Sequence, residues 1–192
     1  LNIENDAILK DNTQQGLALA LYGDETILDN CFLKSHGETL FVGPLPLDLS
    51  PLDKTLKSTQ GRHLIVNTRI EGSKKLVFGC GNVLFKNCQL HANHDGSYVA
   101  PGHFDKDDLG FILDHCKLTS EKGKTLYLAT PWRNHGKVNF IECQFGPLEK
   151  DRYQTNGINH FYFYEAPYVE NSLSKPLEQT QIKKLLDPKT WS

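Results

Sequence analysis

The sequence predicts an all-β fold, a parallel β-helix in which the chain winds through successive coils and ends in a short helix. A six-residue phrase occurs five times, at residues 28–33, 65–70, 85–90, 113–118 and 140–145. Its fourth residues lie 37, 20, 28 and 27 positions apart, and these intervals suit one supersecondary unit per coil. Polar turns, and not helices of 3.6-residue period, separate the copies, which disfavours a βαβ fold. A β-sandwich would need closely spaced hairpin pairs, and few are evident.

Each copy of the phrase describes a strand with a bend in it. Its fourth residue is Cys or Thr, and the apolar residue two places later falls on the same strand face. The apolar residue that begins the phrase is out of phase with these two. A bend before the fourth residue explains the change of phase. Asn30, Asn67 and Asn87 stand there, and Asn tolerates a corner conformation.

Four of the five cysteines fall within this phrase. Stacked coils place equivalent residues in columns, so Cys31, Cys88, Cys116 and Cys143 are expected to form an internal ladder. A buried free cysteine packs as a small hydrophobe, and this inert role is the expected one. The odd number of cysteines and the absence of a CxxC pair indicate neither a disulfide framework nor a zinc site. Cys80 lies outside the phrase, and its role stays open.

The segments between the copies are assigned from their turn residues. Residues 43–61 begin with three prolines in nine positions and are expected to form a projecting loop. An aromatic run over residues 160–165 predicts one more strand. Ser174 is expected to cap a helix over residues 174–186 that packs along the side of the solenoid. Turns or polar loops are expected at residues 23–24, 94–96, 105–110 and 146–159.

The composition is that of one soluble domain over residues 1–192. Hydrophobic residues make up 39% of the chain and charged residues 23%, which allows a real core. The formal charge of −2 indicates neither a nucleic-acid binder nor a membrane-surface binder, and no apolar run approaches the roughly 18 residues of a membrane span. A monomer is expected. Because the sequence starts at Leu1 and contains no methionine, we expect that N-terminal sequence is missing.

Several phrases resemble those of the pectin methylesterases, aspartyl esterases that remove methyl groups from the homogalacturonan of cell walls. The matched segments lie in family order and cover nearly the whole chain. Residues 15–31 resemble the family's QAVAL…GD…NC segment, and residues 38–41 resemble its QDTLY phrase. Residues 70–88 are similar to its IEG-x-VDFIFG…F-x-NC block, and residues 127–143 to its YLGRPWR…KV…NC block, with a weaker match over 98–111. The resemblance implies a right-handed parallel β-helix.

The resemblance also implies a mechanism. One aspartate attacks the methyl-ester carbonyl, a second acts as general acid and base, two glutamines stabilise the oxyanion, and an arginine orients the nucleophile. Carried over position by position, the first glutamine is Gln15 and the acid/base aspartate falls on Glu38. The second glutamine falls on Gly37, the nucleophile on Lys75 and the arginine on Thr130.

These substitutions predict a pectinesterase-like protein whose ester hydrolysis is weak or absent. An ammonium group cannot attack an ester, and removal of a nucleophile typically lowers the rate by about 10⁴–10⁶. If the fold is kept, Lys75 and Glu38 are expected to face each other as an ion pair. Two alternatives stay open. One is a non-catalytic β-helix that binds polygalacturonate, and the other is an esterase or thioesterase of altered mechanism that uses Glu38.

Aromatic and basic residues near the matched phrases predict a groove for pectin or an oligogalacturonide. The residues expected to line it are Phe41, Phe78, Tyr98, Trp132 and Arg133. For Phe78 and Tyr98 the alternative is packing in the core. Lys74 and Lys137 are candidates to attract a uronate chain, with ordinary solvated charge as the alternative.

No cofactor and no metal are expected. His91 and His94 stand three residues apart, but the histidines lie in turn-like sequence and lack the converging spacing of metal ligands. The family resemblance implies an extracellular protein, and a cytoplasmic location stays open.

Overall fold

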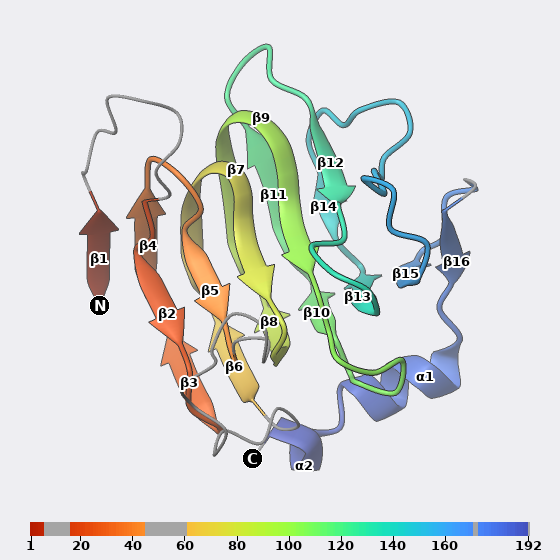
Figure 1. The fold of residues 1–192 in the computed structure, drawn as a ribbon. Helices are drawn as coiled ribbons and strands as arrows, with labels where there is room; N and C mark the ends of the chain where they lie inside the picture. The colour runs from red at the N-terminus through yellow and green to blue at the C-terminus, as the bar shows by residue number, and fades with distance from the viewer. Residues whose placement is uncertain (6–15, 45–60, 171–172, 192) are drawn as a thin grey trace.

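The computed structural model describes residues 1–5, 16–44, 61–170 and 173–191, and within them the chain forms a right-handed parallel β-helix, as predicted (Figure 1). Every pairing between its strands is parallel. Parallel strands joined by crossovers within one sheet are right-handed in almost all proteins, because strand twist favours that hand. The expected loop over residues 43–61 lies largely outside the described residues.

Each coil passes through three faces. The front face holds β2 (Leu19–Leu21), β5 (Leu40–Val42), residues 74–79 of β7 (Arg69–Gly79), residues 96–101 of β9 (Gln89–Pro101) and β12 (Leu126–Ala129). The second face holds β3 (Thr26–Asp29), β6 (Arg62–Val66), β8 (Asn82–Lys86), β10 (Phe111–Asp114), β13 (Gly136–Ile141), β15 (Phe161–Ala166) and β16 (Ser174–Pro176). The third face holds β1 (Asn2–Asn5), β4 (Phe32–Ser35), residues 69–72 of β7, residues 89–92 of β9, β11 (Lys117–Ser120) and β14 (Gln144–Phe145).

The strands β7 and β9 bend from the third face to the front face. Their register shifts between Gly72 and Lys74, opposite the segment before Gly96. Lys74 has a φ of 60° and Gly96 a φ of 155°. A Cβ on Gly96 would stand 2.3 Å from the Lys74 carbonyl oxygen, so only glycine fits the inside of this bend. The turn expected at residues 94–96 is therefore a bend inside a long strand.

The predicted corner in the repeated phrase is confirmed in all five copies. The residue before each Cys or Thr has a positive φ of 49–54°, and the five are Asn30, Asn67, Asn87, His115 and Glu142. Asn adopts this left-handed conformation more readily than His or Glu. Each corner N–H donates a hydrogen bond to a carbonyl of the following coil, as Asn87 does to Asp114 at 3.0 Å. Pairing between coils thus holds the corner even where its residue does not favour it.

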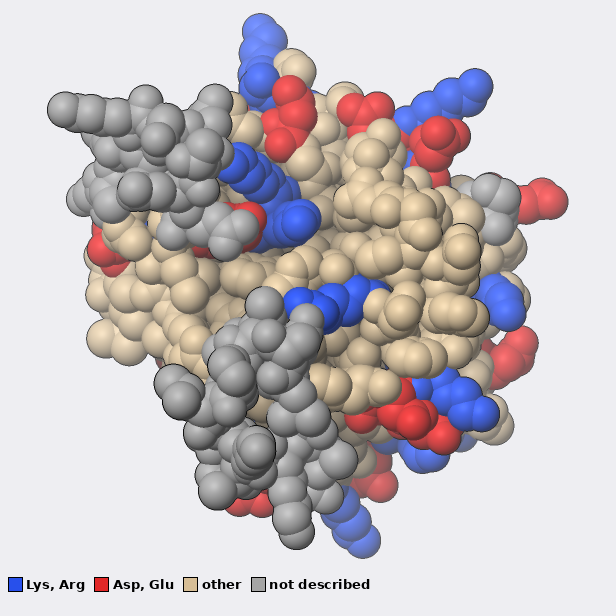
Figure 2. Space-filling model, in the orientation of Figure 1, with Lys and Arg blue, Asp and Glu red and all other residues tan. Residues whose placement is uncertain are grey.

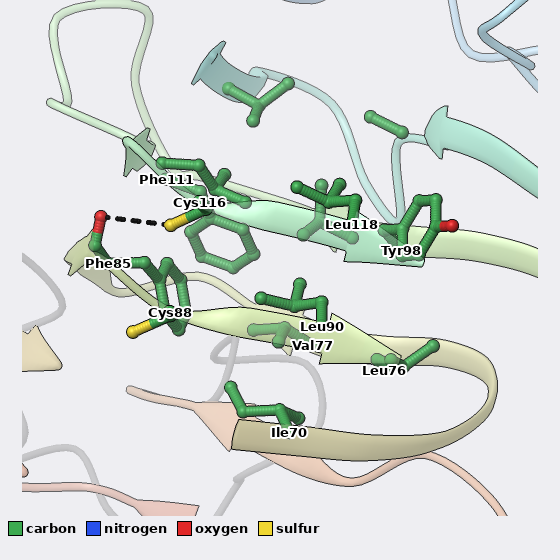
Figure 3. Packing of buried hydrophobic residues seen from close by; sticks show 14 of the residues in the cluster. Ile70, Leu76, Val77, Phe85, Cys88, Leu90, Tyr98, Phe111, Cys116 and Leu118 are labelled. Atoms are coloured by element: carbon green, nitrogen blue, oxygen red, sulfur yellow. Dashed lines mark hydrogen bonds between the residues drawn. The ribbon is translucent and has the colours of Figure 1, made fainter. Parts of the chain in front are cut away.

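The expected cysteine ladder is also present, with Thr68 standing between Cys31 and Cys88. Cys88 and Cys116 lie in the core and Cys143 packs against it, and each of these three thiols donates to a carbonyl of the preceding coil. Cys88 donates to the Ile65 carbonyl at 3.3 Å. Cys116 donates to the Phe85 carbonyl at 3.5 Å, as the dashed line in Figure 3 marks. All five cysteines are free. The ladder therefore belongs to the core and closes backbone hydrogen bonds between coils.

The C-terminal helix packs on the outside of the second face, as expected, but it begins later than predicted. The helix α1 covers Gln179–Leu185 with Glu178 as its N-cap, and α2 covers Pro188–Trp191. Leu177, Leu185 and Trp191 cover the outward side chains of Leu84 and Ile112. No helix among the described residues is long and apolar enough to cross a membrane.

The prediction that Ser174 caps the C-terminal helix is wrong. It lies in β16 beside Phe163, and its hydroxyl donates to the buried Glu165 carboxylate at 2.9 Å. A polar partner in the preceding coil, Glu165, therefore binds the hydroxyl that was expected to cap the helix. The capping is done instead by Glu178, which exchanges hydrogen bonds with Gln181 in a capping box.

Candidate functional site

The front face carries a cluster of aromatic rings, which we call the aromatic platform: Tyr22, Phe41, Phe78 and Trp132. Phe41 and Phe78 are register partners on β5 and β7, with ring centroids 5.2 Å apart. Trp132 follows β12 and meets Phe78 edge-to-face at 5.4 Å. Tyr22 extends the platform on the other side, 5.4 Å from Phe41. Edge-to-face packing fixes ring orientation, so the platform is rigid. Phe41, expected to line the groove, has only 2% of its surface exposed, so its ring supports the platform from below. The accessible apolar surface is that of Tyr22, Phe78 and Trp132.

Trp132 is positioned by backbone pairing and by a glycine. Its N–H donates to the Pro101 carbonyl at 2.8 Å, which continues the ladder of the front face beyond β12. A Cβ on Gly102 would lie 3.2 Å from the indole ring, so glycine at this position leaves room for the ring. The Arg133 guanidinium lies over the same indole, 5.1 Å from its centroid. This cation–π contact places a positive charge at the border of the platform.

Lys75 lies on the same face, three residues before Phe78 on β7. The bend at Lys74 has just turned the strand onto this face, and Lys75 pairs in register with Ser97 of β9. Its side chain is half-buried and forms no hydrogen bond or ion pair with any described residue. Figure 2 shows basic atoms in the hollowed centre of this face, with acidic atoms beside one group of them and largely uncharged surface around.

Glu38 lies one coil earlier and is buried, with 3% of its surface exposed. The Thr39 N–H donates to the Leu76 carbonyl at 3.1 Å, so Glu38 is beside Lys75 in the backbone register. The expected ion pair between these two residues is nevertheless not formed within the described part of the chain. The Glu38 carboxylate is buried, whereas the Lys75 side chain is partly exposed to solvent. Drawing the ammonium into a buried pair would remove its hydration at a high cost.

The comparisons with known proteins agree on one family. The chain is 34% identical over 143 residues to probable pectinesterase 49 of Arabidopsis thaliana, which covers 72% of this chain and 35% of that protein. Probable pectinesterase 50 of the same plant is 32% identical over the same shares. The pectin methylesterase of Aspergillus niger has the same fold, with a TM-score of 0.77 at 20% identity over 99% of this chain and 62% of that one.

The chain belongs to the pectinesterase family. The pectin methylesterase of Erwinia chrysanthemi also shares the fold, with a TM-score of 0.71 at 19% identity, over 100% of this chain and 68% of that one. No family model matches the sequence. The chain spans about a third of the length of the curated relatives it matches.

At Gly37, where the family resemblance implies a catalytic glutamine, the backbone of this chain leaves no room for a side chain. A Cβ on Gly37 would stand 2.8 Å from the Gly16 nitrogen and 3.0 Å from its oxygen. Ser35 fastens this contact, because its hydroxyl donates to the Gly16 carbonyl at 2.6 Å and accepts from the Gly37 N–H at 3.2 Å. A glutamine therefore does not fit here without movement of the backbone. Gln15, expected from the resemblance to be the other glutamine, lies outside the described residues.

Thr130, where the family resemblance implies an arginine, is buried at 3% exposure. Its N–H donates to the Val99 carbonyl at 3.1 Å, which places it beside Ala100 in the row that contains Phe41 and Phe78. The position is thus still on the front face, next to the platform, but it carries a short neutral side chain. Thr130 therefore supplies neither a guanidinium nor any other charge to the front face.

Two residues expected at the groove lie elsewhere. Tyr98 is completely buried in the core with Leu76 and Val77, and burial raises the pKa of its phenol to about 12. It therefore cannot line a surface groove. Lys137 lies on the second face, where its ammonium donates to the carbonyls of Lys106 at 3.1 Å and Asp108 at 2.8 Å. Burial lowers the pKa of Lys137, and its charge serves to fasten the turn before β10.

Three further residues support the site without having been predicted. Tyr22 joins the platform, and Gly102 makes room for Trp132. Buried His103 accepts a hydrogen bond from the Lys137 N–H through Nδ1 and donates to the Gly81 carbonyl through Nε2. It is therefore a neutral imidazole that joins three coils, and burial lowers its pKa to about 4. Only its position after the Tyr98–Pro101 match could have drawn attention to it.

The described residues contain no group of three His, Cys, Asp or Glu side chains that could hold a metal ion. A pocket of about 160 Å³ lies between α1 and the second face, where Lys137, Lys184 and Asp107 give it mixed charge. It is separate from the aromatic platform. On the front face, the chemistry on offer is an apolar aromatic surface, a lysine ammonium, an arginine over an indole and one buried carboxylate.

Proposed function

We propose that this protein binds homogalacturonan on its front face and does not hydrolyse methyl esters by the family's mechanism. The observation that carries the proposal is Lys75, a half-buried cation at the position where the family resemblance implies the nucleophilic aspartate. Aromatic surfaces bind sugar rings through their apolar faces, and the aromatic platform offers such a surface beside Lys75. The fold and the platform support binding, while the substitutions argue against turnover.

The argument against turnover rests on three positions. Lys75 offers an ammonium in place of an attacking carboxylate. Gly37 offers no side-chain donor to an oxyanion, and its backbone contact with Gly16 excludes one. Thr130 offers no charge to orient a nucleophile. Loss of an oxyanion donor typically costs about 10²–10³ in rate and loss of a nucleophile about 10⁴–10⁶, although the two do not add.

Two measurements test the proposal. Calorimetric titration with galacturonan oligomers is expected to show binding by the native protein and at least tenfold weaker binding by Trp132→Ala. The matched control is Tyr168→Ala, an exposed aromatic residue on the loop after β15, which should leave affinity unchanged. No binding by the native protein, or equal binding by Trp132→Ala, would overturn the proposal.

Methanol release from highly methylated pectin tests the second part of the proposal, that the protein does not hydrolyse methyl esters. The native protein is expected to release none above a no-enzyme control. Glu38 is the residue to watch, because it is the buried carboxylate beside Lys75 in the register. Steady turnover that Glu38→Gln abolishes would instead establish an esterase of altered mechanism centred on Glu38, and the proposal of a non-hydrolytic protein would be wrong.

A further inference from the structure

We infer that the front face selects galacturonan with free carboxylates over galacturonan with methyl esters, and that Lys75 is the residue that determines this selectivity. The inference rests on the proposed function, because it names the form of the polymer that the same surface binds. Its first basis is the availability of the Lys75 ammonium. The side chain is half-buried and makes no hydrogen bond or ion pair with the described residues, so its charge is not neutralised there.

The second basis is the set of charges around Lys75. Glu38 is its neighbour in the register, yet its carboxylate is buried and does not pair with Lys75. Lys74, exposed at the bend, adds a second cation, and the opposite register partner, Ser97, is neutral. Arg133 adds a third positive charge beyond Trp132. Three basic side chains therefore stand on this side of the platform, and Figure 2 shows basic atoms in the hollow of this face, although the whole chain carries −2.

The third basis is geometry along β7. Lys75 precedes Phe78 by three residues, which corresponds to about 10 Å at the rise of a strand. A sugar ring on Phe78 and Trp132 and a carboxylate at Lys75 thus belong to different units of one oligomer. The apolar contact holds the chain, and the ammonium meets a charge farther along it.

A carboxylate and a methyl ester differ strongly at such a point. The carboxylate accepts a charge-assisted hydrogen bond from the ammonium, whereas the ester is neutral and a weaker acceptor. The partial burial of Lys75 strengthens this difference, because the surrounding apolar surface lowers the effective dielectric. A hydrogen bond to a charged partner corresponds to a change of about tenfold or more in affinity.

The test is titration of one oligogalacturonide length in two forms, fully de-esterified and fully methyl-esterified, at low and at physiological salt. The native protein is expected to bind the free acid about tenfold more tightly, with a preference that shrinks as salt rises. Lys75→Gln should lower affinity for the free acid about tenfold and leave affinity for the ester unchanged. Lys117→Gln, an exposed lysine on the third face, is the matched control and should change neither.

Each of the other possible results overturns one identifiable claim. Equal affinity of the native protein for both forms overturns the selectivity and leaves the proposed function standing. An unchanged preference in Lys75→Gln, or an equal loss for both forms, overturns the role of Lys75. Binding of neither form by the native protein overturns the proposed function and the inference with it. A circular dichroism spectrum of each variant establishes that its fold is retained.

Discussion

Gly37 and Gly16 touch through their backbones, so closely that a Cβ on Gly37 would stand 2.8 Å from the Gly16 nitrogen. This contact lies at a position where the family resemblance implies a glutamine. The loss of that side chain is therefore built into the packing of adjacent coils. Reversing it requires movement of the backbone and not only a new side chain.

The first prediction follows from this contact. Gly37→Ala is expected to lower the free energy of unfolding by about 1–3 kcal/mol, as overpacking of a close contact does. Urea denaturation measures it. Gly23→Ala is the matched control, because its Cβ would meet nothing nearer than the Thr26 hydroxyl at 3.8 Å. Equal stability of the two variants would show that the coil shifts freely at Gly37.

A second prediction concerns restoration of the family's chemistry. Lys75→Asp combined with Thr130→Arg is expected to release methanol from methylated pectin where the native protein does not. Its rate should stay about 10²–10³ below that of an esterase with both glutamines, because Gly37 still supplies no donor. Adding Gly37→Gln should unfold the protein and not raise the rate.

The control for this series is Lys117→Asp with Thr130→Arg, which places the new carboxylate on the third face. Methanol release by the control would point to a contaminating activity. A Lys75→Asp, Thr130→Arg variant that folds and binds pectin but releases no methanol would show that the geometry of the old catalytic site has been lost.

A third prediction concerns the cysteine ladder. Cys31, Cys80, Cys88 and Cys116 are buried, and only Cys143 is partly exposed. Hydrogen-bond contact with the Cys143 and Cys88 thiols, together with burial, raises the pKa of the Cys116 thiol, which makes it a poor nucleophile. A thiol reagent should therefore modify about one group in the native protein and all five in urea. Cys143→Ser should abolish the native reaction, and rapid modification of that variant would contradict the ladder as described.

Much of the fold could be predicted from the repeated phrase. The phrase is a local pattern that indicates both the left-handed corner in each coil and the stacked column of cysteines. The phase change within six residues indicated a bend, and all five bends are left-handed corners. Ser174 was misassigned for the opposite reason. A Ser before an apolar run resembles a helix cap, but its actual partner, Glu165, comes from the preceding coil and no local pattern reveals it.

The site was predictable by position and less so by orientation. Lys75 and Trp132 lie on the front face where the matched phrases placed them. For Tyr98 the alternative of core packing is the correct one, because simple alternation fails at the bend of β9 and Tyr98 points into the core together with Val99. The Lys75–Glu38 pair failed because neighbouring backbone positions do not determine whether two side chains turn toward water or toward the core.

A fourth prediction concerns acid stability. His103 is held neutral by its two hydrogen bonds, and burial lowers its pKa to about 4 from an ordinary value of 6.5. Burial also lowers the pKa of His63. A depressed folded-state pKa means that the unfolded chain binds the proton first. The stability from these residues is therefore complete above about pH 6.5 and is lost as the pH falls toward 4.

For His103 alone this loss amounts to about 3 kcal/mol across that window. Urea denaturation at pH 7.5, 6, 5 and 4.5 measures it. His103→Gln should be less stable at pH 7.5 but show a flatter dependence on pH. His94→Gln, an exposed histidine, should retain the steep dependence of the native protein. A native protein whose stability is constant from pH 7.5 to 4.5 would contradict the burial of a neutral His103.

The fifth prediction concerns the C-terminal end of the core, where a carboxylate lies at a position that an apolar residue fills in the preceding coil. Glu165 follows Phe140 in register, and only 1% of its surface is exposed. Its charge is met by the Arg152 guanidinium, and its other oxygen accepts from the Ser174 hydroxyl at 2.9 Å. The pair ties the polar loop before β15 to the last two strands of the second face.

Arg152→Ala is therefore expected to lower the free energy of unfolding by about 3–5 kcal/mol, because it leaves a buried carboxylate without its cation. Adding Glu165→Gln should recover part of that loss, since an amide is far less costly to bury than a charge. Glu149→Ala, in the same loop, is the matched control for the loss of a charged side chain. Two outcomes would show that the Arg152–Glu165 pair does not stabilise the last coils of the β-helix. One is an Arg152→Ala variant that unfolds at the same urea concentration as the native protein, and the other is a further loss of stability when Glu165→Gln is added.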